Sequence, residues 1–259
     1  DPSWWSDRAL FRHNHVLSSY WISKKWPNFR EVLRIPKDVT VWADSGGYTI
    51  ATKGVKVDIR DALKWQERNA DIAFTLDIPP TIVTAGNQIS PGKNERVSAD
   101  KFEQCAETTR KNNLFFLNNK STDLLIYNVQ HGWDLKTQNL WWDYTAKDIP
   151  FDGYATGAKP VGDCLLQAMC IMHLWDKGVR ERIHLLGVSS ITVIPVLVWA
   201  SQYIDKVSFD SKSYGYGSIT RAYVYPDKIR YYTHLGKKKN TKKDQLNKFT
   251  CTCPVCSQF

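Results

Sequence analysis

The chain has 259 residues, of which 42% are hydrophobic and 24% are charged, so it is too long for a small disulfide module and too apolar for a disordered protein. Its 35 Lys and Arg against 26 Asp and Glu give a net charge of +9, which favours a polyanionic partner, although the charge could equally serve solubility. No uncharged apolar run reaches the roughly 18 residues that a membrane-spanning helix needs.

Short apolar segments alternate with amphipathic segments along most of the chain. The apolar segments predict buried parallel strands at 39–43, 72–76, 124–129, 153–156, 182–186 and 206–209. The amphipathic segments predict helices at 59–70, 97–111, 135–146, 164–177 and 191–204. Repeated βα units in one chain form either an open doubly wound sheet or a closed (β/α)8 barrel.

Polar or glycine-containing residues follow one predicted strand after another. They are Asp44-Ser45-Gly46-Gly47, Asp77, Gln130-His131-Gly132, Gly157-Ala158, Gly187 and Asp210-Ser211. Each alone would be an ordinary turn, because Asp, Gly and Ser are common in turns. A closed barrel brings all these strand ends to one rim, where such barrels build their active sites. The pattern therefore favours an α/β fold of the (β/α)8 TIM-barrel type.

The character of the chain changes after the last predicted strand. We predict a catalytic barrel over 1–213 and a smaller region over 214–259, which contains a hairpin at 222–225 and 228–232. A basic run at 237–243 has two equally good interpretations, a solvated loop or a contact with phosphates.

Three cysteines, Cys251, Cys253 and Cys256, lie close together near the end of the sequence. Thiolates at this spacing suit a tetrahedral structural Zn²⁺ site and are too close for a set of disulfides. A fourth ligand is not evident, because His234 lies in a Tyr-rich hairpin. The other cysteines lie in predicted helices, so the pattern favours a reducing compartment.

Asp44 and Asp210 end two separate predicted strands. On a common rim they would supply a nucleophile and a proton shuttle for displacement at an anomeric carbon. A turn or a helix cap is the alternative role for each, and the spacing leaves both interpretations open.

Six segments together resemble, in order and approximate spacing, the tRNA-guanine transglycosylase superfamily. They are Asp44-Ser45-Gly46-Gly47-Tyr48, Asn128-Val129-Gln130-His131-Gly132, Gly153-Tyr154-Ala155-Thr156-Gly157-Ala158, His184-Leu185-Leu186-Gly187-Val188, Phe209-Asp210-Ser211 and Cys251-Thr252-Cys253-Pro254-Val255-Cys256. The last two are similar to archaeal-type enzymes. The short frame and the Trp-rich start resemble the phage and bacterial enzymes that insert 7-deazaguanines into DNA. The resemblance covers nearly the whole chain.

The resemblance implies a (β/α)8 barrel with a zinc-binding subdomain that exchanges guanine in a nucleic acid for a free 7-deazaguanine base without ATP. Asp210 would be the nucleophile on the sugar C1′, and Asp44 the general acid/base. The remaining implied residues would bind the base: Asp77 on its amino and imino edge, Gln130 and the backbone of Gly157 and Ala158 on its carbonyl side, and Tyr48 and Leu186 on its two faces. A flipped-out base needs such stacking and edge contacts.

The sequence departs from the family pattern at Thr49, where Gln is usual, at Ala158, where a second Gly is usual, and at Lys159-Pro160, where a hydrophobic pair is usual. These departures leave the 7-substituent open. The sequence shows no His beyond Cys256 and no tRNA-reading C-terminal domain, so it is either truncated or minimal, and a minimal architecture favours DNA over tRNA. We expect a cytoplasmic location, which for a phage protein is the host cytoplasm.

Two other classes of protein remain as alternatives. A catalytically silent nucleic-acid-binding subunit would keep the barrel and its basic surface, but the presence of both Asp44 and Asp210 argues against it. A metal-dependent barrel hydrolase needs several His and carboxylates at strand ends, and of the histidines His131 alone meets that requirement.

Overall fold

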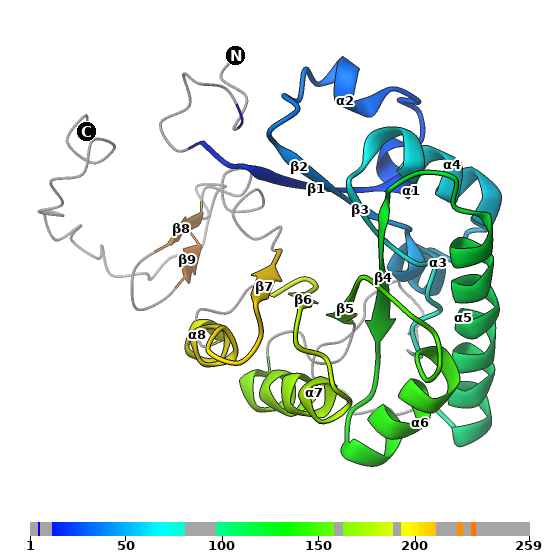
Figure 1. Cartoon of the computed structure of the whole chain (residues 1–259), viewed down its shortest axis with the longest axis vertical. Coiled ribbons are helices and arrows are strands. Elements are labelled where there is room, and N and C mark those ends of the chain that lie inside the picture. Colours follow the sequence, from blue (N-terminus) through cyan, green and yellow to red (C-terminus); the bar gives the residue numbers. More distant parts are fainter. Residues whose placement is uncertain are drawn as a thin grey trace, which may run out of the picture. The chain divides into compact units, whose positions relative to one another are not determined.

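A computed structural model of the chain describes residue 5 and residues 12–80, 97–157, 163–188 and 193–210, with the backbone alone at 52, 222–224 and 229–231 (Figure 1). The chain divides into two units: His13–Ser211, which holds the main sheet, and a second unit that joins Asp1–Arg12 to Lys212–Phe259. Ala158 and the cysteines Cys251, Cys253 and Cys256 lie outside the described residues.

Seven parallel strands form the sheet of the first unit, and their order in space follows the chain. They are β1 (His15–Ser19), β2 (Thr40–Asp44), β3 (Ile72–Phe74), β4 (Leu125–Gln130), β5 (Gly153–Thr156), β6 (Arg182–Leu185) and β7 (Lys206–Phe209). A doubly wound sheet would reverse its order at a switch point, whereas the strands of a TIM barrel follow one another. The sheet curls like half of a barrel (Figure 1). The predicted TIM-like α/β fold is confirmed, and closure by an eighth strand stays a prediction.

Helices follow the strands and lie along the outer side of the curled sheet (Figure 1). The longer ones are α4 (Ile59–Asn69), α5 (Ala99–Asn119), α6 (Leu135–Thr145) and α7 (Cys164–Asp176), and α8 (Ile194–Ala200) precedes β7. Each of the four longer helices begins at a residue whose side chain accepts a backbone N–H of the first turn, namely Asp58, Ser98, Asp134 and Asp163. Such caps satisfy N–H groups that have no partner within the helix.

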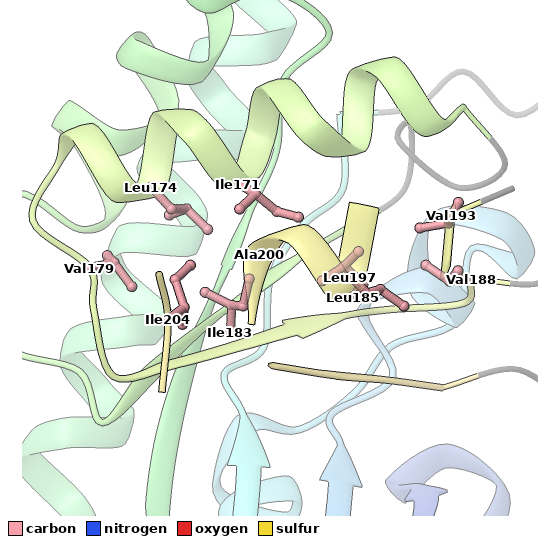
Figure 2. Close-up of a cluster of buried hydrophobic side chains, with 10 residues drawn as sticks. All are labelled: Ile171, Leu174, Val179, Ile183, Leu185, Val188, Val193, Leu197, Ala200 and Ile204. Carbon is pink, nitrogen blue, oxygen red and sulfur yellow. The ribbon is translucent and has the colours of Figure 1, made fainter. Parts of the chain in front are cut away.

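Packing of α7 and α8 against β6 shows which side chains face outward (Figure 2). Ile183 and Leu185 of β6 are buried in an apolar cluster with Ile171 and Leu174 of α7 and Leu197 of α8. Because side chains alternate along a strand, the residue between them, His184, faces the inner side of the curl.

A second cluster fills that inner side. Its buried members are Trp42, Ile72, Phe74, Tyr127, Val129 and Ala155, which come from β2, β3, β4 and β5. Burial of each large apolar side chain stabilises the fold by about 1.5–3 kcal/mol. The inner face is therefore a packed core. The residues at the carboxyl ends of the strands lie at one end of this core, where a site can form.

The predicted strands agree with β2 to β7 within two residues at either end. Sequence reasoning missed β1 and the short helices α1 (Tyr20–Ser23), α2 (Phe29–Val32) and α3 (Gly47–Lys53). It also ended α5 too early, and it made α8 too long, because Pro195 stands at the first turn of that helix.

The predicted hairpin is confirmed in the second unit, where β8 (Ala222–Val224) pairs antiparallel with β9 (Ile229–Tyr231). In the described ranges, none of the helices combines the length and apolarity that crossing a bilayer requires.

Candidate active site

Three carboxylates lie at the carboxyl ends of the parallel strands. Asp44 is the last residue of β2, Asp77 follows β3, and Asp210 comes directly after β7. The charges of Asp77 and Asp210 both raise the pKa of Asp44, so the three groups are near enough to interact. Asp44 and Asp210 therefore lie near one another at the same edge of the sheet, as their positions at strand ends predicted, and Asp77 lies there too.

Asp44 is poised between its protonated and ionised forms. Burial is the main reason that its pKa rises from 3.8 to about 6, and the negative charges of Asp77 and Asp210 add to the rise. The Gly46 N–H, 3.2 Å from Oδ1, and the Ser19 side chain oppose it by stabilising the anion. A carboxyl group with this pKa can both give and take a proton near neutral pH.

Asp77 is paired with a histidine. Its Oδ2 lies 2.7 Å from Nε2 of His131, and the two side chains are 8% and 2% exposed. Trp141 packs edge-on against the His131 ring at a centroid distance of 4.7 Å. The pair is therefore held rigidly, which leaves the other oxygen of Asp77, Oδ1, to face the loop after β2.

That loop approaches Asp77 so closely that only glycine fits. A Cβ atom at Gly47 would lie 2.5 Å from Asp77 Oδ1, while Ser45 anchors the same loop by donating from Oγ to the Thr75 carbonyl at 2.9 Å. These two contacts hold the segment that follows Asp44 close to Asp77.

Gly47→Ala is expected to displace Asp77 and to destabilise the first unit by about 1–3 kcal/mol, the usual cost of overpacking. Urea denaturation of the unmodified chain and of the variant measures this loss. Gly54→Asn is the matched control at the C-terminal cap of the same helix, because an added Cβ there meets no atom within 4 Å and Asn tolerates its φ of +62°. Equal effects of the two changes would show that the contact with Asp77 does not matter.

Two polar contacts orient the carboxylate of Asp210. Its Oδ1 accepts the Gly187 N–H at 2.8 Å and lies 3.3 Å from Nε2 of His184. The side chain is 26% exposed, in contrast to the 4% of His184. One side of the carboxylate is thus held by protein donors while another is open to a reactant.

Three of the predicted base-binding residues, Gly157, Leu186 and Tyr48, lie in different surroundings. Gly157 lies beside the Asp77–His131 pair, since a Cβ there would come within 2.6 Å of the His131 ring. Leu186 packs against the inner cluster, and Tyr48 is 50% exposed at the start of α3.

Gln130 points elsewhere. Its side chain is fully buried, and its Nε2 donates to the carbonyl of Gln138 in α6 at 2.8 Å. Alternation along β4 turns Gln130 towards α6 and His131 towards the inner side of the curl. The structure therefore brings Asp44, Asp77, Asp210 and Gly157 together without the Gln130 side chain.

Sequence reasoning missed the roles of His131 and His184 as partners of the rim carboxylates. The available signal was the alternation of side chains along a strand. His131 lies two residues after Val129, and His184 lies two residues before Leu186, so each points to the same face as a residue of the inner cluster. In the described part of the chain, no group of three His, Cys, Asp or Glu side chains is arranged to hold a metal ion.

A separate hollow of about 700 Å³ lies at the opposite ends of β5 and β6, where Gly153, Lys177 and Arg182 line it. None of the predicted site residues lines this hollow. The rim carboxylates, which combine interacting charges with the partly exposed side chain of Asp210, are therefore the better candidate for chemistry.

Comparison with known proteins gives one informative match. No family model matches the chain. The chain is 24% identical over 234 residues to the tRNA-guanine(15) transglycosylase of Methanococcus aeolicus, a match that spans 86% of this chain. The chain spans about a third of that relative's length, 32%. The resemblance carried by the motifs is confirmed at this distance.

Proposed function

We propose that this chain, a distant relative of tRNA-guanine transglycosylases, exchanges guanine in a nucleic acid for a 7-deazaguanine base through a covalent enzyme–sugar intermediate. The observation that carries the proposal is the convergence of Asp44, Asp77 and Asp210 at the carboxyl ends of parallel strands, with the pKa of Asp44 raised to about 6. Two interacting carboxylates in different protonation states are what displacement at an anomeric carbon requires.

In the first half-reaction, the Asp210 carboxylate attacks the sugar C1′. The bond from C1′ to the guanine nitrogen breaks as the ester bond from C1′ to Asp210 forms. Protonated Asp44 donates its proton to the departing base, so guanine leaves neutral.

In the second half-reaction, the incoming 7-deazaguanine gives a proton to the Asp44 carboxylate and attacks C1′. The ester bond to Asp210 breaks, which restores both aspartates to their starting states. No ATP is consumed, because a glycosidic bond replaces a glycosidic bond.

Base recognition would use the pair beside the reacting carboxylates. Asp77 would accept hydrogen bonds from the amino and imino edge of guanine, with the backbone of Gly157 and Ala158 on the carbonyl side and Tyr48 and Leu186 against the ring faces. Gln130 would take part only after its side chain leaves Gln138, to which its amide nitrogen is bonded. A base must leave its stack to enter such a site.

DNA is the favoured polymer, on the resemblance of the Trp-rich start to enzymes that act on DNA. Transfer RNA is the alternative, supported by the name of the curated relative. The net charge of +9 suits either phosphate backbone.

Incubation with labelled guanine and, separately, duplex DNA, single-stranded DNA and tRNA tests the reaction and the polymer together. Label should enter one polymer and be released again when an unlabelled 7-deazaguanine is added. Tight binding of a polymer without any incorporation would instead identify a catalytically silent subunit. Incorporation into tRNA alone would overturn the preference for DNA.

We also propose a structural Zn²⁺ held by Cys251, Cys253 and Cys256, since three soft thiolates at this spacing match the donors that zinc prefers. When bound, the ion would cross-link the second unit. It would take no part in the exchange reaction. Thiolates this close would repel one another without a cation.

Elemental analysis of the intact protein should find one zinc per chain. Chelation should lower the thermal stability of the second unit before it changes the Asp44 and Asp210 chemistry. A metal-free protein whose melting is unchanged by chelator would show that the three thiols are free. Cys164→Ser, at an exposed position on α7, is the control that should retain the metal.

A further inference from the structure

The outer surface of α7 and α8 is more apolar than helices that cover a sheet usually are. Among the described residues, 13 large hydrophobic side chains are exposed, and seven of them lie on these two helices or in the turn after α8. The sequence has no Asp, Glu, Lys or Arg at 164–175 or at 194–204. By contrast, α4 exposes Arg60, Lys64 and Arg68, which is the usual pattern of a helix that faces water.

A groove of about 190 Å³ lies between the two helices. Its floor belongs to the buried cluster that α7 and α8 share with β6 (Figure 2). Its rim is formed by four large side chains that are 38–52% exposed: Met172, Trp175, Trp199 and Tyr203. The rings of Trp199 and Tyr203 lie 5.5 Å apart. The groove is therefore an open apolar recess between aromatic side chains.

Three further apolar side chains of the same helices are exposed beside the groove, namely Leu165 at 69%, Ile194 at 46% and Val198 at 58%. A large side chain has about 200 Å² of surface, so the seven exposed fractions together leave about 700 Å² in contact with water. The largest apolar patch of a monomer is usually about 300–600 Å². A standard interface buries about 800 Å² of each partner. The two helices thus expose nearly the area that a stable dimer buries.

The lack of charge determines which class of partner this face suits. A nucleic acid or an anionic membrane is bound through Lys and Arg, and neither helix has one along these stretches. Trp, Tyr and Met, which form the rim of the groove, are enriched at the centres of protein interfaces. The face therefore suits another protein surface.

Charged residues border the face at one end. Asp176 is the last residue of α7, and Lys177 follows it. The guanidinium of Arg180 lies 4.0 Å from the centroid of the Trp175 ring, which orders this indole for contact. An apolar centre with a charged border is the usual anatomy of a protein interface.

We propose that this face binds the same face of a second copy of the chain, so that two chains form a symmetric dimer. In such an interface one patch serves both partners, so the patch must offer both a recess and exposed side chains to fill it. The groove is the recess, and Leu165 and Val198 are the most exposed side chains beside it. Two chains that each carry a net charge of +9 repel one another, and contact through an uncharged face adds no like charges at the interface. The dimer does not depend on the exchange reaction.

Sedimentation of the full chain tests the proposal, after nuclease treatment to remove dimers held by a shared polymer. Interfaces of standard size have dissociation constants that are micromolar or tighter, so the chain should be dimeric at about 50 μM. Met172→Lys places a charge at the groove of both copies and should raise the dissociation constant about 100-fold or more. Leu135→Lys, at a 54% exposed position on α6, is the matched control and should leave the dimer intact.

Thermal melting of each variant checks that it is folded, which we expect because Met172 is already half exposed. If Met172→Lys does not fold, Val198→Lys on α8 makes the same test. A monomeric unmodified chain at about 50 μM would overturn the proposal. So would a dimer that the folded lysine variants of this face leave unchanged, because the copies would then meet elsewhere. Base exchange by a monomer would overturn the dimer alone, and a dimer of this kind without exchange would overturn the proposed function alone.

Discussion

Replacing Asp210 with asparagine is expected to abolish base exchange, with a fall of about 10⁴-fold or more. The amide matches the carboxylate in shape, and its Oδ1 can still accept the Gly187 N–H that now lies 2.8 Å from Asp210 Oδ1. It cannot form the ester with C1′. Thermal stability should therefore change little while the chemistry stops.

The covalent step has its own measurement. The unmodified chain, incubated with polymer and without an incoming base, should yield a protein–nucleic acid adduct that survives denaturing electrophoresis, and Asp210→Asn should yield none. Asp205→Asn, at an exposed position just before β7, is the control and should form the adduct normally. Full exchange by Asp210→Asn would remove this residue from the covalent role.

Asp44→Asn is expected to inactivate the chain and stabilise it at the same time. The pKa of Asp44 is raised from 3.8 to about 6, so the folded chain holds this proton more tightly than the unfolded chain does. Below about pH 4 Asp44 is protonated in both states, and the folded chain has its full stability. As the pH rises through about 6, ionisation of the buried carboxyl group lowers the free energy of unfolding. At pH 7.5 the penalty is about 1–3 kcal/mol, and asparagine removes it.

Urea denaturation at pH 4 and at pH 7.5 tests the stability, and the exchange assay tests the loss, for which we expect about 10²- to 10⁴-fold. Asp44→Asn should be the more stable protein at pH 7.5, and the difference should shrink towards pH 4. The exposed Asp123→Asn is the control and should show neither effect. A variant that loses activity without gaining stability would show that burial of Asp44 carries no such penalty.

Much of the sheet could be predicted because its strands are buried on both sides. Segments such as β2 and β4 are largely apolar and buried along most of their length, and such short runs between polar loops have few other interpretations. β1 was missed because His15, Ser18 and Ser19 interrupt its apolar pattern. Its place in the sheet comes from pairing with β2, a contact between segments far apart in the chain.

The site could be predicted in part for a similar reason. Asp44 and Asp210 were found from their positions at strand ends, which local pattern reveals. The partners were not, because the contacts of His131 with Asp77 and of His184 with Asp210 depend on which face of a strand each side chain takes. A shift of one residue sends the neighbour Gln130 to the opposite face.

The strand order also determines when the rim carboxylates can come together during synthesis. Each strand pairs with the one made just before it, so a chain that emerges from the ribosome can extend the sheet by one strand at a time. Asp44 arrives with the second strand, whereas Asp210 and the bond from Gly187 that orients it arrive only after the seventh. A nascent or prematurely terminated chain would hold Asp44 and Asp77 without Asp210, and so could not form the covalent adduct that the proposed function requires.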